Sequence, residues 1–357
     1  MLPFVFATNI YPCVYNIEMM GRQIKYSILI IFCFLLLVSV TWAESRIGDS
    51  VVYDISVDVF ENNFESALGA VENMISNEPE NPLGYFLAGA IYQIISEKFR
   101  NDTFEKQIED NLDRAIELCD DRIDDSPDNP DWRFIIGASY GYRGLHRALH
   151  GGWWGAFRDG MKCKSNLLET LKLDSTYYDA YLGLGSYYYY RTIKAKDFLW
   201  LPFISDNREK GMSQIRIAIK SGNLAPNIAR QAFLRIFYLE KRFDELLVLA
   251  DSLYLVDSSD AYTLLYYVKG LIAVDSLKQA QIKLERLKEA WENSPYFDSI
   301  GFYEIEYLLA AIAYHKGDKK VVQDYIGRIL KHQSWRRKNA YFNETYERAK
   351  WLSEQID

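Results

Sequence analysis

Hydrophobic residues along most of the chain recur at intervals of three and four, the spacing that places them on one face of an α-helix. Ala67, Val71 and Ile75 follow this spacing, and Pro79 ends the segment. A second apolar segment at the same spacing opens at Tyr85. The pattern predicts two amphipathic helices joined by a turn that contains proline.

This unit then recurs along the chain. Residues 115–127 reproduce the spacing of residues 67–79, and a third copy spans 163–175, where Ser175 replaces the proline. Each copy leads into a helix that carries a glycine, at Gly89, Gly137 and Gly185. A helix pair that repeats in this way cannot bury its apolar face alone, so we expect neighbouring pairs to stack into one continuous core.

These residues resemble a known family. The tetratricopeptide pattern reads W-x2-L-G-x2-Y, then A-x3-F, then P, over roughly 34 residues. Residues 174–185 resemble the junction of two such repeats, and residues 77–82 and 125–130 resemble its turn. The resemblance covers about 45–335 and is clearest over 64–190. It implies an all-α fold, a right-handed superhelical solenoid of antiparallel helix pairs with about six repeats. It implies no single function, because this fold hosts many.

After residue 205 the helical rhythm continues without the full pattern. We therefore predict a repeat domain over 44–335 and a polar C-terminal capping helix within 336–357. Solenoids need such a cap for solubility. Further helices are expected at 211–219, 232–240, 243–255, 261–273, 277–291, 305–315, 322–330 and 344–355.

The N-terminal residues have the pattern of an export signal. Arg22 and Lys25 precede an apolar run over 26–40, and Thr41-Trp42-Ala43 supplies small residues before a cut after Ala43. Residues 1–43 are therefore predicted to be removed, with 1–18 an over-extended start, and the protein to be exported to a periplasm or secreted. The alternative is a membrane anchor at 26–43, although the apolar run is shorter than the roughly 20 residues of a membrane span.

Composition narrows the function. The chain holds 27 Tyr, 19 Phe and 8 Trp at a formal net charge of -8, and it has no strongly basic stretch. Nucleic acid is therefore not an expected partner. Cys119 and Cys163 fall at inward positions of predicted helices, as buried thiols or, alternatively, as a bridge between neighbouring helices.

No catalytic or cofactor-binding residue is predicted. His146 and His150 lie four residues apart and share a helix face, but the intervening residues lack the glutamate of H-E-x-x-H. A metal-dependent enzyme that uses this pair, with Asp159 as a third ligand, is a minor alternative. No G-x-S-x-G motif and no phosphate-binding glycine-rich loop is present.

Two surfaces are candidates for partner binding. Insertions are expected at 99–107, 143–159 and 194–206, and loops of repeat proteins gather on one face. The second and third carry Trp153, Trp154, Trp200 and Phe203, which either form an exposed binding or membrane-interface site or fold back onto the core.

The other candidate is the concave groove, which the first helix of each pair lines in tetratricopeptide proteins. Tyrosine there suits a peptide or a glycan, although packing between repeats explains the same pattern. The leading hypothesis is a non-enzymatic scaffold that holds a protein or peptide partner in this groove, outside the cytoplasm. The expected groove residues are Phe134, Tyr142, Leu182, Ser186, Tyr189, Tyr190, Tyr307 and Tyr314.

Overall fold

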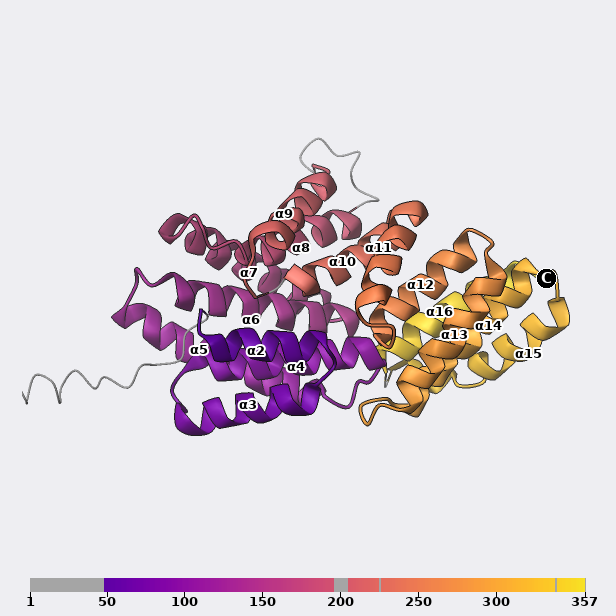
Figure 1. Cartoon of the computed structure of the whole chain (residues 1–357), viewed down its shortest axis with the longest axis horizontal. Helices are drawn as coiled ribbons and strands as arrows, with labels where there is room; N and C mark the ends of the chain where they lie inside the picture. The colour runs from indigo at the N-terminus through magenta and orange to yellow at the C-terminus, as the bar shows by residue number, and fades with distance from the viewer. Residues whose placement is uncertain (1–47, 196–204, 225, 338, 357) are drawn as a thin grey trace, which may run out of the picture. The chain divides into compact units, whose positions relative to one another are not determined.

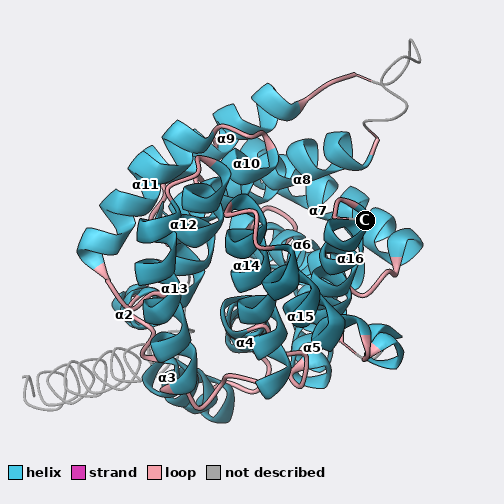
Figure 2. Ribbon diagram, turned by 90° about the vertical axis from the view of Figure 1, so that its right-hand side faces the viewer, coloured by secondary structure: helices cyan, strands magenta, loops and turns pink. Residues whose placement is uncertain are grey.

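A computed structural model describes residues 48–195, 205–224, 226–337 and 339–356, which lie within one compact unit. The predicted export signal and the predicted binding residues Trp200 and Phe203 lie outside the described residues. The described chain consists of helices, turns and loops, without a strand (Figure 2). The predicted all-α class is confirmed.

The helices follow one another as antiparallel pairs (Figure 1). The even-numbered helices from α2 to α14 open each pair, and α16 follows the last pair: α2 (Ser50–Phe60), α4 (Pro82–Phe99), α6 (Pro130–Leu149), α8 (Ala180–Lys194), α10 (Pro226–Leu239), α12 (Ala261–Ala273), α14 (Phe302–His315) and α16 (Ala340–Glu354). The odd-numbered helices close them: α3 (Phe64–Asn77), α5 (Glu105–Asp125), α7 (Trp153–Leu173), α9 (Arg208–Ser221), α11 (Phe243–Val256), α13 (Leu277–Glu292) and α15 (Lys319–Leu330). Two short 3₁₀ turns, η2 (Ser299–Gly301) and η3 (Gln333–Arg337), flank α14 and α16.

Two of the expected insertions are shorter than predicted. The segment 143–159 extends α6 to Leu149 and starts α7 at Trp153, so the predicted loop there is wrong. Gly151, at a φ of 79°, makes the short reversal between the two helices possible. Between α4 and α5 the connection shrinks to residues 100–104. Helix α10 begins at Pro226, several residues before the predicted start, because proline is favoured in the first turn of a helix.

Paired helices approach closely where the repeated glycines lie. A Cβ atom added at Gly185 of α8 would lie 2.6 Å from the carbonyl oxygen of Gly211 and 2.7 Å from Cγ1 of Ile215, both on α9. Gly89 and Gly137 meet α5 and α7 in the same way. The repeat glycine is therefore a requirement of packing between the two helices of a pair.

The stack also folds back on itself, which the repeat pattern does not predict. In a simple solenoid each repeat touches only its neighbours. Here Lys98 of α4 forms an ion pair with Asp260 at 2.7 Å, and its carbonyl accepts a hydrogen bond from Nε1 of Trp291 at 2.9 Å. Asn101 donates to the carbonyl of Tyr296 at 2.7 Å. The α3–α4 region therefore lies directly against α12, α13 and the turn that follows α13.

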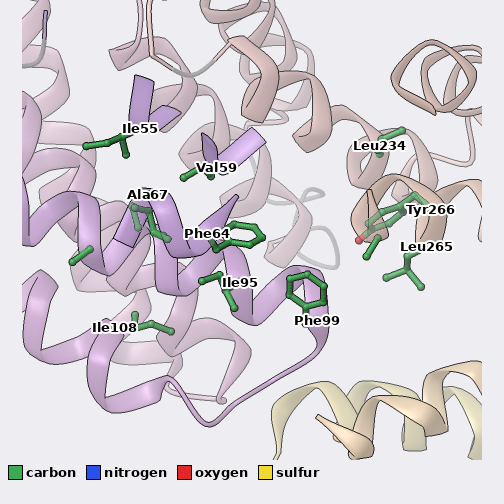
Figure 3. Packing of buried hydrophobic residues seen from close by; sticks show 14 of the residues in the cluster. Ile55, Val59, Phe64, Ala67, Ile95, Phe99, Ile108, Leu234, Leu265 and Tyr266 are labelled. Atoms are coloured by element: carbon green, nitrogen blue, oxygen red, sulfur yellow. The ribbon is translucent and has the colours of Figure 1, made fainter. Parts of the chain in front are cut away.

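Hydrophobic packing continues across this closure. Phe64 and Phe99 form an aromatic group with Tyr296, with ring centroids 5.7–6.1 Å apart. Figure 3 shows Phe64 and Phe99 in the same core cluster as Leu265 and Tyr266 of α12. Helices near the two ends of the repeat array thus share one core.

The C-terminal helix does more than cover the last repeat. Helix α16 buries Phe342, Tyr346 and Leu352 against α14 and α15. It also reaches α4, since the Tyr341 hydroxyl lies 3.0 Å from that of Ser96. Helix α16 therefore joins the end of the chain to its first repeats.

Candidate functional site

Seven even-numbered helices, α4 to α16, bring polar and charged side chains together on their inner side. Glu304 of α14 lies at the centre of one group of these side chains. We call Glu304 and the charged side chains around it the charge network. Glu304 forms ion pairs with Lys269 of α12 at 3.0 Å and with Arg348 of α16, and it lies 4.0 Å from Arg100 at the end of α4. Glu344 of α16 pairs with Arg100 at 3.2 Å. The network ties four helices that are distant in sequence.

The charged groups of this network shift one another's pKa values. Burial alone would raise the pKa of Glu304, but Arg348, Lys269 and Arg100 outweigh burial and hold that pKa well below its ordinary value. Burial lowers the pKa of Lys269 to about 7, with Arg348 and Arg100 adding to the effect and Glu304 opposing it. Because Glu304 and Lys269 are only 2% and 4% exposed, we assign the network a structural role.

Next to this network lies a second group, which we call the tyrosine–arginine cluster. It consists of one guanidinium, one carboxylate and three phenols from five helices. Arg235 of α10 lies 4.0 Å from Glu97 of α4, and its guanidinium carbon lies 5.8 Å from the centre of the Tyr190 ring. We assign Tyr142 of α6 and Tyr262 of α12 to the same cluster, because the Glu97 carboxylate adds to the effect of burial in raising the pKa of both phenols.

The polar ends of this cluster have few partners within the protein. The hydroxyls of Tyr142, Tyr190 and Tyr262 form no hydrogen bond with any described residue. Arg235 likewise has no hydrogen-bonded acceptor among the described residues, since Glu97 at 4.0 Å is beyond hydrogen-bond distance. Burial raises the pKa of all three phenols, that of Tyr142 to about 12, so they stay protonated and can donate.

The cluster remains in contact with solvent. Arg235 and Glu97 are 26% and 18% exposed, and Tyr142, Tyr190 and Tyr262 are half-buried. Glu344 is 44% exposed, although Arg100 and Arg348 lower its pKa to about 2 against the effect of burial. The cluster is therefore partly exposed to solvent, and its donors have no hydrogen-bond acceptor among the described residues.

The residues predicted to line the groove lie in several different environments. Tyr142 and Tyr190 lie in the tyrosine–arginine cluster, and Tyr307 lies beside the charge network, with the Arg348 guanidinium 4.6 Å from its ring centre. Tyr189 has no exposed surface and donates to Glu240 at 3.0 Å, so it belongs to the core. Phe134 is buried against Tyr177 and Phe86, and Leu182 packs against the core formed by α8, α9 and α10. Ser186 is half-buried, and Tyr314 is exposed near the end of α14.

The two described tryptophans of the second insertion face solvent. Trp153 is 50% exposed and Trp154 is 83% exposed at the start of α7. The interpretation in which they fold back onto the core is wrong. None of the helices in the described ranges is long and apolar enough to span a bilayer.

The histidine pair has a packing role. His146 is buried, and its Nδ1 donates to Oε1 of Gln93 at 3.2 Å. Burial and the neighbouring His150 lower the pKa of His146 to about 4. Burial also opposes protonation of His150, but the Asp102 carboxylate, 3.5 Å from its Nε2, and the hydrogen bond from its Nδ1 to the His146 carbonyl outweigh burial and raise the pKa to about 9. In the described part of the chain, no group of three His, Cys, Asp or Glu side chains is placed to hold a metal.

The cysteines are buried thiols, as the first of the two sequence interpretations holds. Cys119 on α5 and Cys163 on α7 are both free. Burial raises the pKa of both, that of Cys163 to about 12, so neither is a reactive thiolate near neutral pH.

Sequence reasoning missed Arg235, Glu97 and Tyr262. A positional signal exists for part of the cluster, since Tyr142 and Tyr190 each stand five residues after a repeat glycine, Gly137 and Gly185. Helix α10 has no glycine, so its register, and with it the inward direction of Arg235, could not be aligned with the earlier repeats.

Comparison with known proteins finds similarity among solved structures. The sequence matches no family model and no curated protein. The chain is similar to the crystal structure of a tetratricopeptide repeat protein from Parabacteroides merdae, at 13% identity and a TM-score of 0.41, over 84% of this chain and 97% of that chain. In this chain the tetratricopeptide-like features are the successive helix pairs and the glycines at which they meet.

Proposed function

We propose that the chain is a non-enzymatic scaffold that binds an extended peptide segment of a protein partner at the tyrosine–arginine cluster. Solenoids of helix pairs commonly present such segments on their inner side. The observation that carries the proposal is a set of half-buried donors without a hydrogen bond among the described residues: Arg235, whose ion pair with Glu97 is long at 4.0 Å, and the hydroxyls of Tyr142, Tyr190 and Tyr262.

The chemistry of the cluster indicates what the peptide presents. A guanidinium without a bonded acceptor suits a carboxylate, because a bidentate pair satisfies both groups at once. Phenol hydroxyls suit backbone carbonyls, and their rings suit apolar side chains. Glu97 stands 4.0 Å from Arg235 and disfavours a second acidic group on its side. The proposed ligand is therefore a peptide with one carboxylate, from Asp, Glu or a C-terminus, next to an apolar residue.

The proposal includes export. Its support is the sequence alone, namely the basic, apolar and small-residue order of residues 22–43. The partner is accordingly a periplasmic, envelope or secreted protein.

The test is selection followed by affinity measurement. A displayed library of random peptides is selected on the intact protein, and the Kd of enriched peptides is measured by fluorescence anisotropy. A hydrogen bond to a charged group contributes about 1.5–3 kcal/mol, so Arg235→Ala should weaken binding roughly 10- to 150-fold. Arg235→Lys should restore part of the loss, and Tyr262→Phe should cost about 2- to 10-fold.

A matched control is available on another helix. Arg286 of α13 is 59% exposed and pairs with Glu289, so Arg286→Ala should leave the Kd unchanged. Failure to enrich any peptide, or equal affinity of wild type and Arg235→Ala, would contradict the proposal.

A further inference from the structure

Helix α7 carries apolar residues on its outer face as well as on its inner face. Its outer apolar residues are 38–83% exposed: Trp153, Trp154, Phe157, Met161 and Leu168. At roughly 100° per residue they fall within about one third of the helix circumference. The buried Cys163 and Leu167 lie outside this sector and pack against α6 and α8. We call the outer group the α7 stripe.

The stripe continues onto the neighbouring helix. The Tyr187 hydroxyl of α8 lies 3.2 Å from the sulfur of Met161, so this phenol borders the stripe. Exposed apolar groups of this kind, when they are contiguous, mark interaction surfaces, whereas single exposed residues need no explanation.

Basic side chains border the stripe. The Lys194 amine at the end of α8 lies 3.9 Å from the centre of the Trp153 ring. Lys164 lies 5.9 Å from the ring centre of Tyr187, and Lys210 lies 3.8 Å from that of Tyr188. Arg158 is exposed on α7 itself. This local basic border stands out in a chain of formal net charge -8.

The acidic residue at this end of α7 does not offset the border. Asp159 is 3% exposed and points inward, where its carboxylate pairs with Arg143 and Arg147, each at 2.8 Å. The outer face of this part of α7 is therefore aromatic and cationic together.

We propose that the α7 stripe docks on an anionic lipid bilayer, with α7 lying in the plane of the interface. Tryptophan favours the boundary between head groups and acyl chains, and an amphipathic helix with a basic border binds where anionic lipids supply the counter-charge. The charge complementarity selects an anionic surface over a neutral one. This docking site is separate from the tyrosine–arginine cluster and does not depend on the peptide proposal.

The test uses the full chain, labelled at single positions. Phe157→Cys places an environment-sensitive fluorophore in the stripe, and Ile282→Cys, on α13, places it at a site of similar exposure, 57% against 51%. Cys13 and Cys33 are replaced by serine in every variant, and the native Cys119 and Cys163 are buried and stay unlabelled. Vesicles of phosphatidylcholine alone, or with phosphatidylglycerol, are then added. Attachment through residues 26–40 alone would tether the chain without inserting position 157 into the bilayer, so the label at position 157, compared with the label at position 282, tests docking of α7 itself.

The expected result is a blue shift at position 157, with quenching by lipids that carry a quencher on the acyl chain, and no change at position 282. The apparent affinity should be at least 10-fold higher for phosphatidylglycerol vesicles and should fall as salt rises. Trp153→Ser/Trp154→Ser should abolish the shift at 157, whereas Trp351→Ser, which removes a 55% exposed tryptophan on α16, should not.

Three outcomes would overturn the proposal. The first is an unchanged emission at 157 with anionic vesicles. The second is an equal response at 282, which would show unspecific adsorption. The third is a shift at 157 that grows with protein concentration without vesicles, which would assign the stripe to a second copy of the chain. Retained helical circular dichroism and melting temperature show that each variant is folded.

Discussion

The closest approach between two helices of one repeat gives a sharp prediction for Gly185→Ala. The added methyl would lie 2.6 Å from the Gly211 carbonyl oxygen and 3.0 Å from the Ile215 nitrogen. Both atoms belong to the backbone of α9, so a side-chain rotation cannot relieve the overlap. Helix α8 and helix α9 must move apart, and overpacking of this kind costs about 1–3 kcal/mol.

A second effect acts in the opposite direction and has to be measured separately. Alanine is favoured over glycine inside a helix by about 1 kcal/mol. Gly69 of α3 isolates that effect, because a Cβ atom there meets nothing within 4 Å. Gly69→Ala should therefore stabilise the protein by about 0.4–1 kcal/mol. The difference between the two alanine variants then reports the packing cost alone.

Thermal unfolding followed by circular dichroism measures this difference. One kcal/mol corresponds to about 2–4 °C in Tm for a domain of 150–250 residues and to less in a larger one. The Gly185→Ala variant should melt about 2–6 °C below the Gly69→Ala variant. Gly185→Leu should be worse, because three more carbons meet the same backbone. Equal Tm values for Gly185→Ala and Gly69→Ala would refute the close-packed α8–α9 interface.

Three further predictions concern the charge network, the histidine pair and the N-terminus. Glu304→Gln leaves buried cations without their shared carboxylate and should lower the free energy of unfolding in urea by about 3–5 kcal/mol, whereas Glu285→Gln, on an exposed position of α13, should change it little. Since the folded-state pKa of His150 is raised to about 9, its contribution to stability is fully present below about pH 6.5 and is lost as pH rises through 9. His150→Gln should flatten the fall in Tm over that window, and an unchanged pH profile would contradict the Asp102 pairing. N-terminal sequencing of the exported protein should begin at Glu44, and a chain that keeps residues 19–43 would favour the anchor alternative.

The local helices could be predicted well from the sequence. Helix α12 begins and ends where its apolar spacing predicts, at Ala261 and Ala273, because Asp260 caps its first turn by accepting from the Thr263 amide at 2.7 Å. The loop expected around Gly151 failed because a two-glycine reversal needs only a few residues and leaves its flanks free to be helical. The spacing of apolar residues within a segment depends on how that segment packs against its neighbour in the chain, so the helix pairs could be predicted from the sequence.

The closure of the stack could not be predicted in this way. Lys98 and Asp260 are ordinary surface residues by composition, and nothing in their local sequence indicates that they form a buried pair 2.7 Å apart. The tyrosine–arginine cluster could be predicted from the sequence only in part. Tyr142 and Tyr190 share a register with the repeat glycines, whereas α10 has no glycine that would align Arg235 with them, and Glu97 meets Arg235 from a helix distant in sequence.

The most direct test of the account is the affinity of a selected peptide for wild type, Arg235→Ala and Arg286→Ala. The account predicts peptides with a carboxylate beside an apolar residue, a loss of roughly 10- to 150-fold for Arg235→Ala, and no loss for Arg286→Ala. If all three proteins bind the peptides equally, the inner cluster is not the binding surface and the central claim is wrong.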